Sequence, residues 1–166
     1  MFGWRVLALA ALTATASTGL AGVRYNAPPP DFAMATAHGT RYLHDLRGRV
    51  VVVNFWATWC EPCTREMSTF VRARHAFGDR VAVITVSSEA PDVAASYFRL
   101  WNIDLPLVED TRGAISRAYG VSEIPVTLVL DPEGNVTYVS LGGLSWEELQ
   151  RAIEAAASTP TPRVLQ

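Results

Sequence analysis

The sequence predicts an α/β domain in which a mixed central sheet lies between two layers of helices, a three-layer α/β/α sandwich. Residues 50–56 and 81–86 are continuous runs of β-branched and aromatic residues without polar alternation, a pattern typical of strands that are covered on both faces. Segments with helical spacing follow both runs. The 166 residues are 49% hydrophobic and 18% charged, which suits one domain with a sizeable core and excludes a disordered chain.

The first half of the domain is expected to alternate strands with helices. We predict a short edge strand over 40–43, a turn at 47–49, a buried strand over 50–56 and a second buried strand over 81–86. A helix beginning at Cys60 places Cys63, Met67, Phe70 and Val71 on one face. Pro91 opens another helix, whose inward face is predicted to carry Val93, Ala94, Tyr97, Phe98 and Trp101.

The second half is expected to end in a hairpin and a helix. Asp110 is predicted to N-cap a short helix that runs through Tyr119 and stops at Gly120. Strands over 127–130 and 136–141 are joined by Asp131–Asn135, whose Asp, Pro and Gly suit a type I turn. Ser145 and Glu148 form a capping box, with Leu144 and Leu149 as its hydrophobic staple. The predicted order is β-β-α-β-α-α-β-β-α.

Residues 1–26 predict a signal peptide or a membrane anchor, followed by a linker. Arg5 precedes 18 uncharged residues over 6–23, which would span about 27 Å as a helix, near the lower limit for crossing a bilayer. A single arginine before an apolar core and small residues is equally typical of a cleavable signal peptide. Either alternative predicts an extracytoplasmic protein and allows N-terminal membrane association.

The folded domain is predicted over residues 27–158, with its first ordered residues near Asp31 or Phe32. The preceding Ala27–Asp31 is rich in proline and is expected to be a stiff linker. Residues 159–166 are predicted to be a disordered C-terminal tail.

The charge balance argues against two classes of function. Fourteen basic residues against sixteen acidic ones give a net charge of −2, so nucleic acid is not expected as a partner. All the basic residues are arginine, which excludes a Schiff-base mechanism on lysine.

The chemistry is expected at Cys60 and Cys63, the only cysteines in the sequence. A disulfide between residues three apart constrains the unfolded chain very little, so it is not expected to serve stability. Zinc would need further ligands, and His38, His44 and His75 lack the spacing for it.

The position of this pair favours redox chemistry. It opens a helix directly after a buried strand, where unpaired N–H groups and the helix dipole stabilise a thiolate. We expect Cys60 to be exposed and to attack a substrate disulfide, and the shielded Cys63 to resolve the mixed disulfide. Running in reverse, the same steps would oxidise a substrate.

Residues 52–63, VVNFWATWCEPC, resemble the active-site segment of the thioredoxin superfamily. More narrowly, the chain resembles the extracytoplasmic thiol-disulfide oxidoreductases of the TlpA/ResA type. Further matching segments follow in the same order as in that family, over residues 27–32, 119–121, 124–127 and 130–134. The resemblance implies a thioredoxin-like fold in which residues 90–119 correspond to an extra segment inserted into the thioredoxin core.

The resemblance also assigns roles to residues outside the cysteine pair. Pro125 matches the family's cis-proline, which lies against the dithiol and leaves the backbone of Ile124 free to pair with a substrate. Glu66 matches a glutamate that assists proton movement near the cysteines, and Trp59 is expected to shape the docking surface. Asn54 stands where thioredoxin has a buried aspartate, and this difference shifts the proton-transfer role towards Glu66.

The function that the resemblance implies is a protein-disulfide reductase that needs neither a metal nor a cofactor beyond its cysteine pair. Its clients would be proteins with disulfides, apocytochrome c among them, and a membrane thiol electron donor would reduce it again. Glu61 between the cysteines is expected to raise the pKa of the Cys60 thiol, which favours a reductant.

Two alternatives remain open. One is a disulfide oxidant or isomerase of the same fold, and another is a copper-binding assembly factor that uses the soft thiolates. A peroxidase of related fold is disfavoured, because its motif keeps a lone reactive cysteine.

Overall fold

The computed structural model describes residues 20–158, so the greater part of the predicted leader and the predicted tail over 159–166 lie outside the described residues. The elements are β1 (Ala33–Thr36), β2 (Gly39–Tyr42), the 3₁₀ turn η1 (Leu43–Leu46), β3 (Val50–Phe55), α1 (Glu61–Phe77), the 3₁₀ turn η2 (Gly78–Arg80), β4 (Val81–Ser87), α2 (Pro91–Leu100), β5 (Leu107–Glu109), α3 (Ala114–Tyr119), β6 (Val126–Leu130), β7 (Val136–Leu141) and α4 (Trp146–Ala157). Across residues 20–158, no helix combines the length and apolar character that crossing a membrane requires.

A mixed sheet of five strands forms the middle of the molecule, in the order β5-β4-β3-β6-β7. β4 runs parallel to β3 and to β5, whereas β6 is antiparallel to β3 and to β7. β1 and β2 form a separate antiparallel hairpin. The central strand β3 is buried at every residue, as its unbroken apolar pattern predicts.

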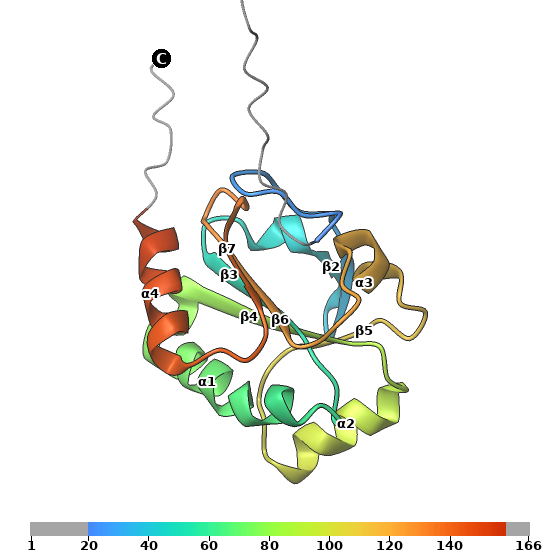
Figure 1. Ribbon diagram of the computed structural model, residues 1–166. Coiled ribbons are helices and arrows are strands. Elements are labelled where there is room, and N and C mark those ends of the chain that lie inside the picture. The colour runs from blue at the N-terminus through green and yellow to red at the C-terminus, as the bar shows by residue number, and fades with distance from the viewer. Residues whose placement is uncertain (1–19, 159–166) are drawn as a thin grey trace, which may run out of the picture.

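Two hydrophobic cores lie on opposite faces of this sheet. Val50 and Val52 of β3 join the core beneath α1, α2 and α4, whereas Val51 and Val53 join the core beneath α3, η1 and the β1–β2 hairpin. Figure 1 shows α1 and α4 on one side of the sheet and α3 with β2 on the other. The predicted α/β/α sandwich with a mixed sheet is therefore confirmed, and the hairpin contributes to its second layer.

The prediction missed two short strands. β1 has one buried residue in four and β5 has only three residues, so neither shows a readable pattern. Pro106 directly precedes β5, and the Thr85 N–H donates to its carbonyl at 2.9 Å. Because proline has no N–H to donate, the pairing of β4 with β5 does not continue beyond this point. The predicted strand over 40–43 lies one residue earlier, as β2.

Leu20 and Val23, which precede the predicted start of the domain at residue 27, pack against it. Leu20 and Val23 are buried in the core beneath α3. The Asn26 N–H donates to the Val136 carbonyl at 2.9 Å, and the Val136 N–H donates to the Ala27 carbonyl at 3.0 Å. The apolar character of Leu20 and Val23, interpreted in the sequence as the end of the leader, thus belongs to the core of the domain.

The predicted inward face of α2 is partly wrong. Ala94 and Phe98 are buried, and Phe98 stacks on Trp56 with 5.2 Å between ring centroids. Val93 is 41% exposed and Trp101 is 63% exposed. The helix is short and ends at Leu100, so Trp101 is its C-cap and lies outside the buried stripe.

The predicted helix ends are confirmed for α4 and corrected for α3. The Ser145–Glu148 capping box is present, and Gly120 ends α3 in the left-handed conformation. Asp110 is not the formal N-cap, because α3 begins at Ala114 after Gly113. Its carboxylate nevertheless accepts the N–H groups of Ile115 and Ser116 at 3.0 and 2.8 Å, so it satisfies the first turn from a distance.

Candidate active site

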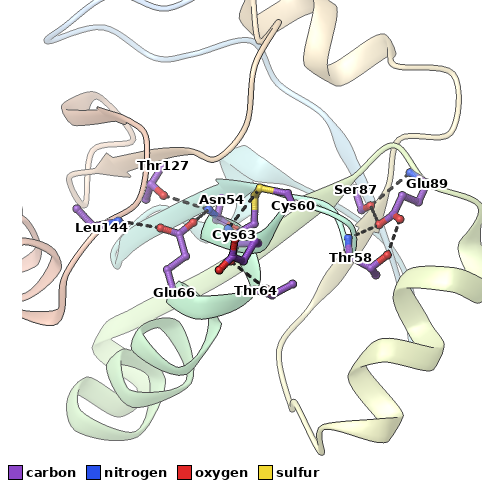
Figure 2. Close-up of a disulfide and its surroundings, with 11 residues drawn as sticks. Asn54, Thr58, Cys60, Cys63, Thr64, Glu66, Ser87, Glu89, Thr127 and Leu144 are labelled. Carbon is purple, nitrogen blue, oxygen red and sulfur yellow. Dashed lines mark hydrogen bonds between the residues drawn. A yellow bond between two sulfur atoms is a disulfide. The ribbon is translucent and has the colours of Figure 1, made fainter.

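The cysteine pair lies where β3 has ended and α1 begins. Cys60 is the N-cap of α1 in an extended backbone conformation, and its Sγ accepts the Cys63 N–H at 3.3 Å. The two sulfurs form a disulfide with an S–S distance of 2.00 Å. Figure 2 shows this disulfide at the start of the helix.

The accessibility of Cys60 is lower than expected. In the disulfide, Cys60 is 5% exposed and Cys63 is fully buried. The prediction of an exposed Cys60 is therefore wrong for the oxidised form, in which both cysteines belong to the core beneath α1, α2 and α4. The order of accessibility is nevertheless the expected one, since all the exposed surface of the pair belongs to Cys60.

Glu66 lies on the next turn of α1 and is 4% exposed. Its Oε1 accepts the Asn54 Nδ2 at 3.0 Å, and its Oε2 accepts the Leu144 N–H at 2.9 Å, from the loop before α4. Burial raises the pKa of Glu66 from 4.5 to about 7, although both hydrogen bonds oppose the shift. Near neutral pH this carboxyl can therefore both take up and give up a proton.

Asn54 connects Glu66 to the sheet. It lies on β3 opposite Thr127 of β6, and its Nδ2 also donates to the Thr127 hydroxyl at 3.1 Å. Its Oδ1 is buried and has no hydrogen-bond partner among the described residues. Figure 2 shows the Glu66 carboxylate with its two N–H donors, beside the helix turn that carries the cysteines.

The charge of Glu61 is partly neutralised. Its carboxylate lies 3.0 Å from the Arg65 guanidinium one turn along α1, and both side chains are exposed. An exposed ion pair of this kind is weak. We therefore expect Glu61 to affect the Cys60 thiol less than an unpaired carboxylate would.

Trp59, Ile124 and Pro125 lie around two neighbouring grooves. Trp59, which is 74% exposed, lines one groove together with Ile124, and Ile124 also lines a second groove with Pro125. The Ile124–Pro125 peptide bond is cis, as the resemblance implies. The structure thus brings the three predicted substrate-binding residues to one continuous surface.

The sequence did not indicate several residues that build the site. Thr127 and the backbone of Leu144 hold the Asn54–Glu66 pair, and Glu89 holds the loop at Thr58. Their partners are separated from them by 73, 78 and 31 residues respectively, so no local motif could have identified them. Within residues 20–158, no group of three or more His, Cys, Asp or Glu side chains is arranged to hold a metal ion.

Comparison with known proteins identifies the family. Residues 25–139 match the AhpC/TSA family. The chain is 33% identical to the thiol-disulfide oxidoreductase ResA of Bacillus subtilis over 70% of its own length and 66% of that protein's. It is 30% identical to ResA of Geobacillus kaustophilus, over 76% of this chain and 74% of the relative.

A solved structure agrees with this assignment. A thiol:disulfide interchange protein of the thioredoxin family from Chlorobium tepidum superposes with a TM-score of 0.70 at 27% identity, covering 81% of this chain and 97% of the other. The same fold, the Cys60–Cys63 pair and relatives named as thiol-disulfide oxidoreductases all agree on the activity. The chain belongs to the AhpC/TSA family of thioredoxin-like proteins and is a thiol-disulfide oxidoreductase of the ResA type.

Proposed function

We propose that this protein is an extracytoplasmic reductase of client-protein disulfides. The Cys60 thiolate attacks one sulfur of the client disulfide, forms a mixed disulfide and expels the other client sulfur as a thiolate. The Cys63 thiolate then attacks the Cys60 sulfur and releases the second client thiolate. The client gains two electrons, and the enzyme is left with the Cys60–Cys63 disulfide.

The observation that carries this proposal is the buried Glu66 on the helix turn after the cysteines. The resolving step needs Cys63 as a thiolate, yet Cys63 is fully buried, and burial opposes its ionisation. A buried carboxyl with a pKa of about 7 is suited to accept that proton. In the proposed mechanism Glu66 therefore serves as the proton acceptor for Cys63. The hydrogen bond from Asn54 Nδ2 holds the Glu66 carboxylate in place for this role.

The groove residues support a protein client rather than a small molecule. Trp59 offers a large exposed aromatic surface, and Ile124 lies where two grooves meet. In the proposed complex an extended client segment packs on Trp59 and pairs with the backbone beside Pro125. Its cysteine then lies over Cys60.

The direction of electron flow is proposed from the charges around the pair. Strong oxidants of this class stabilise their reduced form. Here the Cys60 Sγ accepts one N–H at 3.3 Å, and the carboxyls Glu61 and Glu66 flank the cysteines. Neither feature strongly favours a thiolate, and this supports a reductant. In the proposed mechanism the cysteine pair works without a metal or another cofactor.

The partners are proposed from the resemblance and from the predicted leader. Apocytochrome c, whose haem-site cysteines must be reduced, is the proposed client, and a membrane thiol donor is the proposed source of electrons. Such a donor is required because an oxidising compartment would otherwise leave the pair as a disulfide.

The decisive test is the reduction potential of the Cys60–Cys63 pair, measured by equilibration with a thiol buffer. A value well below about −200 mV, closer to thioredoxin than to DsbA, is expected of a reductase. A value near −120 mV would reverse the proposed direction and make the protein a disulfide oxidant.

A further inference from the structure

A single carboxylate holds the loop that leads into the cysteine pair. Glu89 lies between β4 and α2, and its Oε2 accepts the Thr58 N–H at 2.7 Å. Its Oε1 accepts the Thr58 hydroxyl, also at 2.7 Å. Ser87 supports it, because the Ser87 hydroxyl donates to Oε2 at 3.3 Å and accepts the Glu89 N–H at 3.3 Å. Figure 2 shows these contacts on the side of the disulfide away from Glu66.

Thr58 is well placed to transmit this restraint to the active site. It precedes Cys60 by two residues, in the short connection between β3 and α1. The Trp56 N–H donates to the Val86 carbonyl at 3.1 Å, and the Cys60 N–H donates to the Ala57 carbonyl at 3.2 Å. The carboxylate therefore fixes the middle of a connection whose two ends are already held.

We propose that Glu89 is a positioning residue that favours formation of the Cys60–Cys63 disulfide. The carboxylate holds Thr58, two residues before Cys60, and the disulfide holds Cys60 itself, so each lowers the conformational entropy of Cys60 that remains for the other to remove. By reciprocity of linked equilibria, a restraint that helps the disulfide to form is itself strengthened when the disulfide is present. The Glu89–Thr58 contact thus raises the effective concentration of the two thiols for each other and lowers the reduction potential.

The chemistry of the contact requires a carboxylate. Two donors of one residue converge on two acceptor oxygens, and hydrogen bonds to an ionised acceptor are stronger than neutral ones. Glutamine offers one acceptor oxygen, and its N–H₂ group can meet the Thr58 hydroxyl only as a donor, with that hydroxyl turned to accept. A glutamine at this position would therefore keep the size of the side chain and lose the charged acceptor of both bonds.

The inference rests on the cysteine couple itself and not on its client or on the direction of electron flow. It is tested by the equilibrium constant between the full-length protein and glutathione, with reduced and oxidised forms separated by thiol alkylation and mass. We expect Glu89→Gln to lower the effective concentration of the two thiols by about tenfold, because both Thr58 bonds lose their charged acceptor and the residues before Cys60 are held less firmly. Asp92→Asn, which removes an exposed carboxylate at the start of α2, should change the constant by less than about twofold.

A pair of variants at Thr58 separates positioning from charge. Thr58→Val removes only the hydroxyl bond and leaves the charge of Glu89, and we expect it to lower the constant by about threefold. Thr58→Ser keeps the hydroxyl and should restore the constant to near the wild-type value. In the double variant Thr58→Val/Glu89→Gln, the losses should be less than additive, because both act on one contact.

Two results would overturn the proposal. One is an unchanged constant in both Glu89→Gln and Thr58→Val. The other is an equal loss in Asp92→Asn, which would reduce the effect to general electrostatics. Should Glu89→Gln fail to fold, the comparison of Thr58→Val with Thr58→Ser decides the question alone, since a role in stability only would leave their equilibrium constants equal.

Discussion

At the scale of single residues, the two cysteines are chemically unequal because they occupy different positions at the start of one helix. Cys60 is the N-cap and has the only exposed surface of the pair, whereas Cys63 is one turn inside the helix and fully buried. A client sulfur can therefore approach Cys60 first. This asymmetry, and not the identity of the two side chains, is the reason why we propose Cys60 as the attacking and Cys63 as the resolving thiol.

The first prediction concerns this assignment. Incubated with oxidised glutathione, Cys63→Ser should accumulate a stable glutathione adduct on Cys60, because no resolving thiol remains. Cys60→Ser should form an adduct at least about tenfold more slowly, because thiol reactivity follows accessibility. Mass spectrometry over time measures both rates, with the double serine variant as the blank. Faster modification of Cys60→Ser would invert the roles.

Glu66 gives the folded protein a pH-dependent stability. Below pH 4.5 the group is protonated in the folded and the unfolded chain alike. As the pH rises from 4.5 to about 7, the unfolded chain releases the proton while the folded chain retains it, because burial raises the pKa of Glu66. The stabilisation is therefore complete at low pH and is lost as the pH rises through the folded pKa, by up to about 3 kcal/mol.

The second prediction follows from this loss of stability with rising pH. Glu66→Gln should carry a constant penalty, since its amide cannot accept both the Asn54 Nδ2 and the Leu144 N–H. It should lack the pH-dependent loss of wild type, so the difference in free energy of unfolding between variant and wild type should change between pH 4.5 and pH 7.5. Urea unfolding of both oxidised proteins across this range measures it. Parallel curves would show that Glu66 has an ordinary pKa.

At the scale of elements, the sequence analysis correctly predicted the helices and strands whose own residues form a clear pattern. The continuous apolar run of β3, the CEPC start of α1 and the Ser145–Glu148 box each carry their own physical cause. The misses share the opposite property. β5 is defined by the edge of β4 and not by its three residues, and the exposure of Trp101 depends on where α2 ends.

The segment over residues 20–27 was also missed by the sequence analysis, because its contacts are with distant parts of the chain. Gly22 lies so close to α3 that a Cβ there would overlap the Ala118 carbonyl oxygen. A Cβ on Gly120, which ends α3 with a φ of 73°, would in turn lie only 2.4 Å from the backbone nitrogen of Ala21. Each glycine therefore makes room for the other segment, and this explains why small residues at the end of an apparent leader belong to the fold.

The third prediction tests this contact. Gly22→Ala should lower the free energy of unfolding by about 1–3 kcal/mol, the usual cost of forcing extra atoms into a packed site. Gly143→Ala, where a Cβ meets nothing within 4 Å, is the matched control and should change stability little. Thermal and urea unfolding of the full-length proteins measure both. Equal stability of the two variants would show that residues 20–23 do not pack on α3 in solution.

At the scale of the whole molecule, redox state and folding stability form one thermodynamic cycle. The disulfide can form in the folded or in the unfolded chain, and each state has its own reduction potential. The difference between these two reduction potentials, converted to free energy, equals the difference in free energy of unfolding between the oxidised and the reduced protein. In a strong oxidant such as DsbA the reduced form is stabilised. The Glu89–Thr58 contact, by the proposal above, favours the disulfide instead.

The fourth prediction is that the oxidised protein is more stable than the reduced one. Each 30 mV by which the folded potential lies below that of the unfolded pair should add about 1.4 kcal/mol to the difference. Urea unfolding of the two forms at one pH, with the reduced form kept under excess dithiol, measures it. The difference should shrink in Glu89→Gln and persist in Asp92→Asn, since only the former loses a restraint on the cysteine loop. A reduced form more stable than the oxidised form would mean that the fold drives electrons the other way, and the protein would then oxidise its clients.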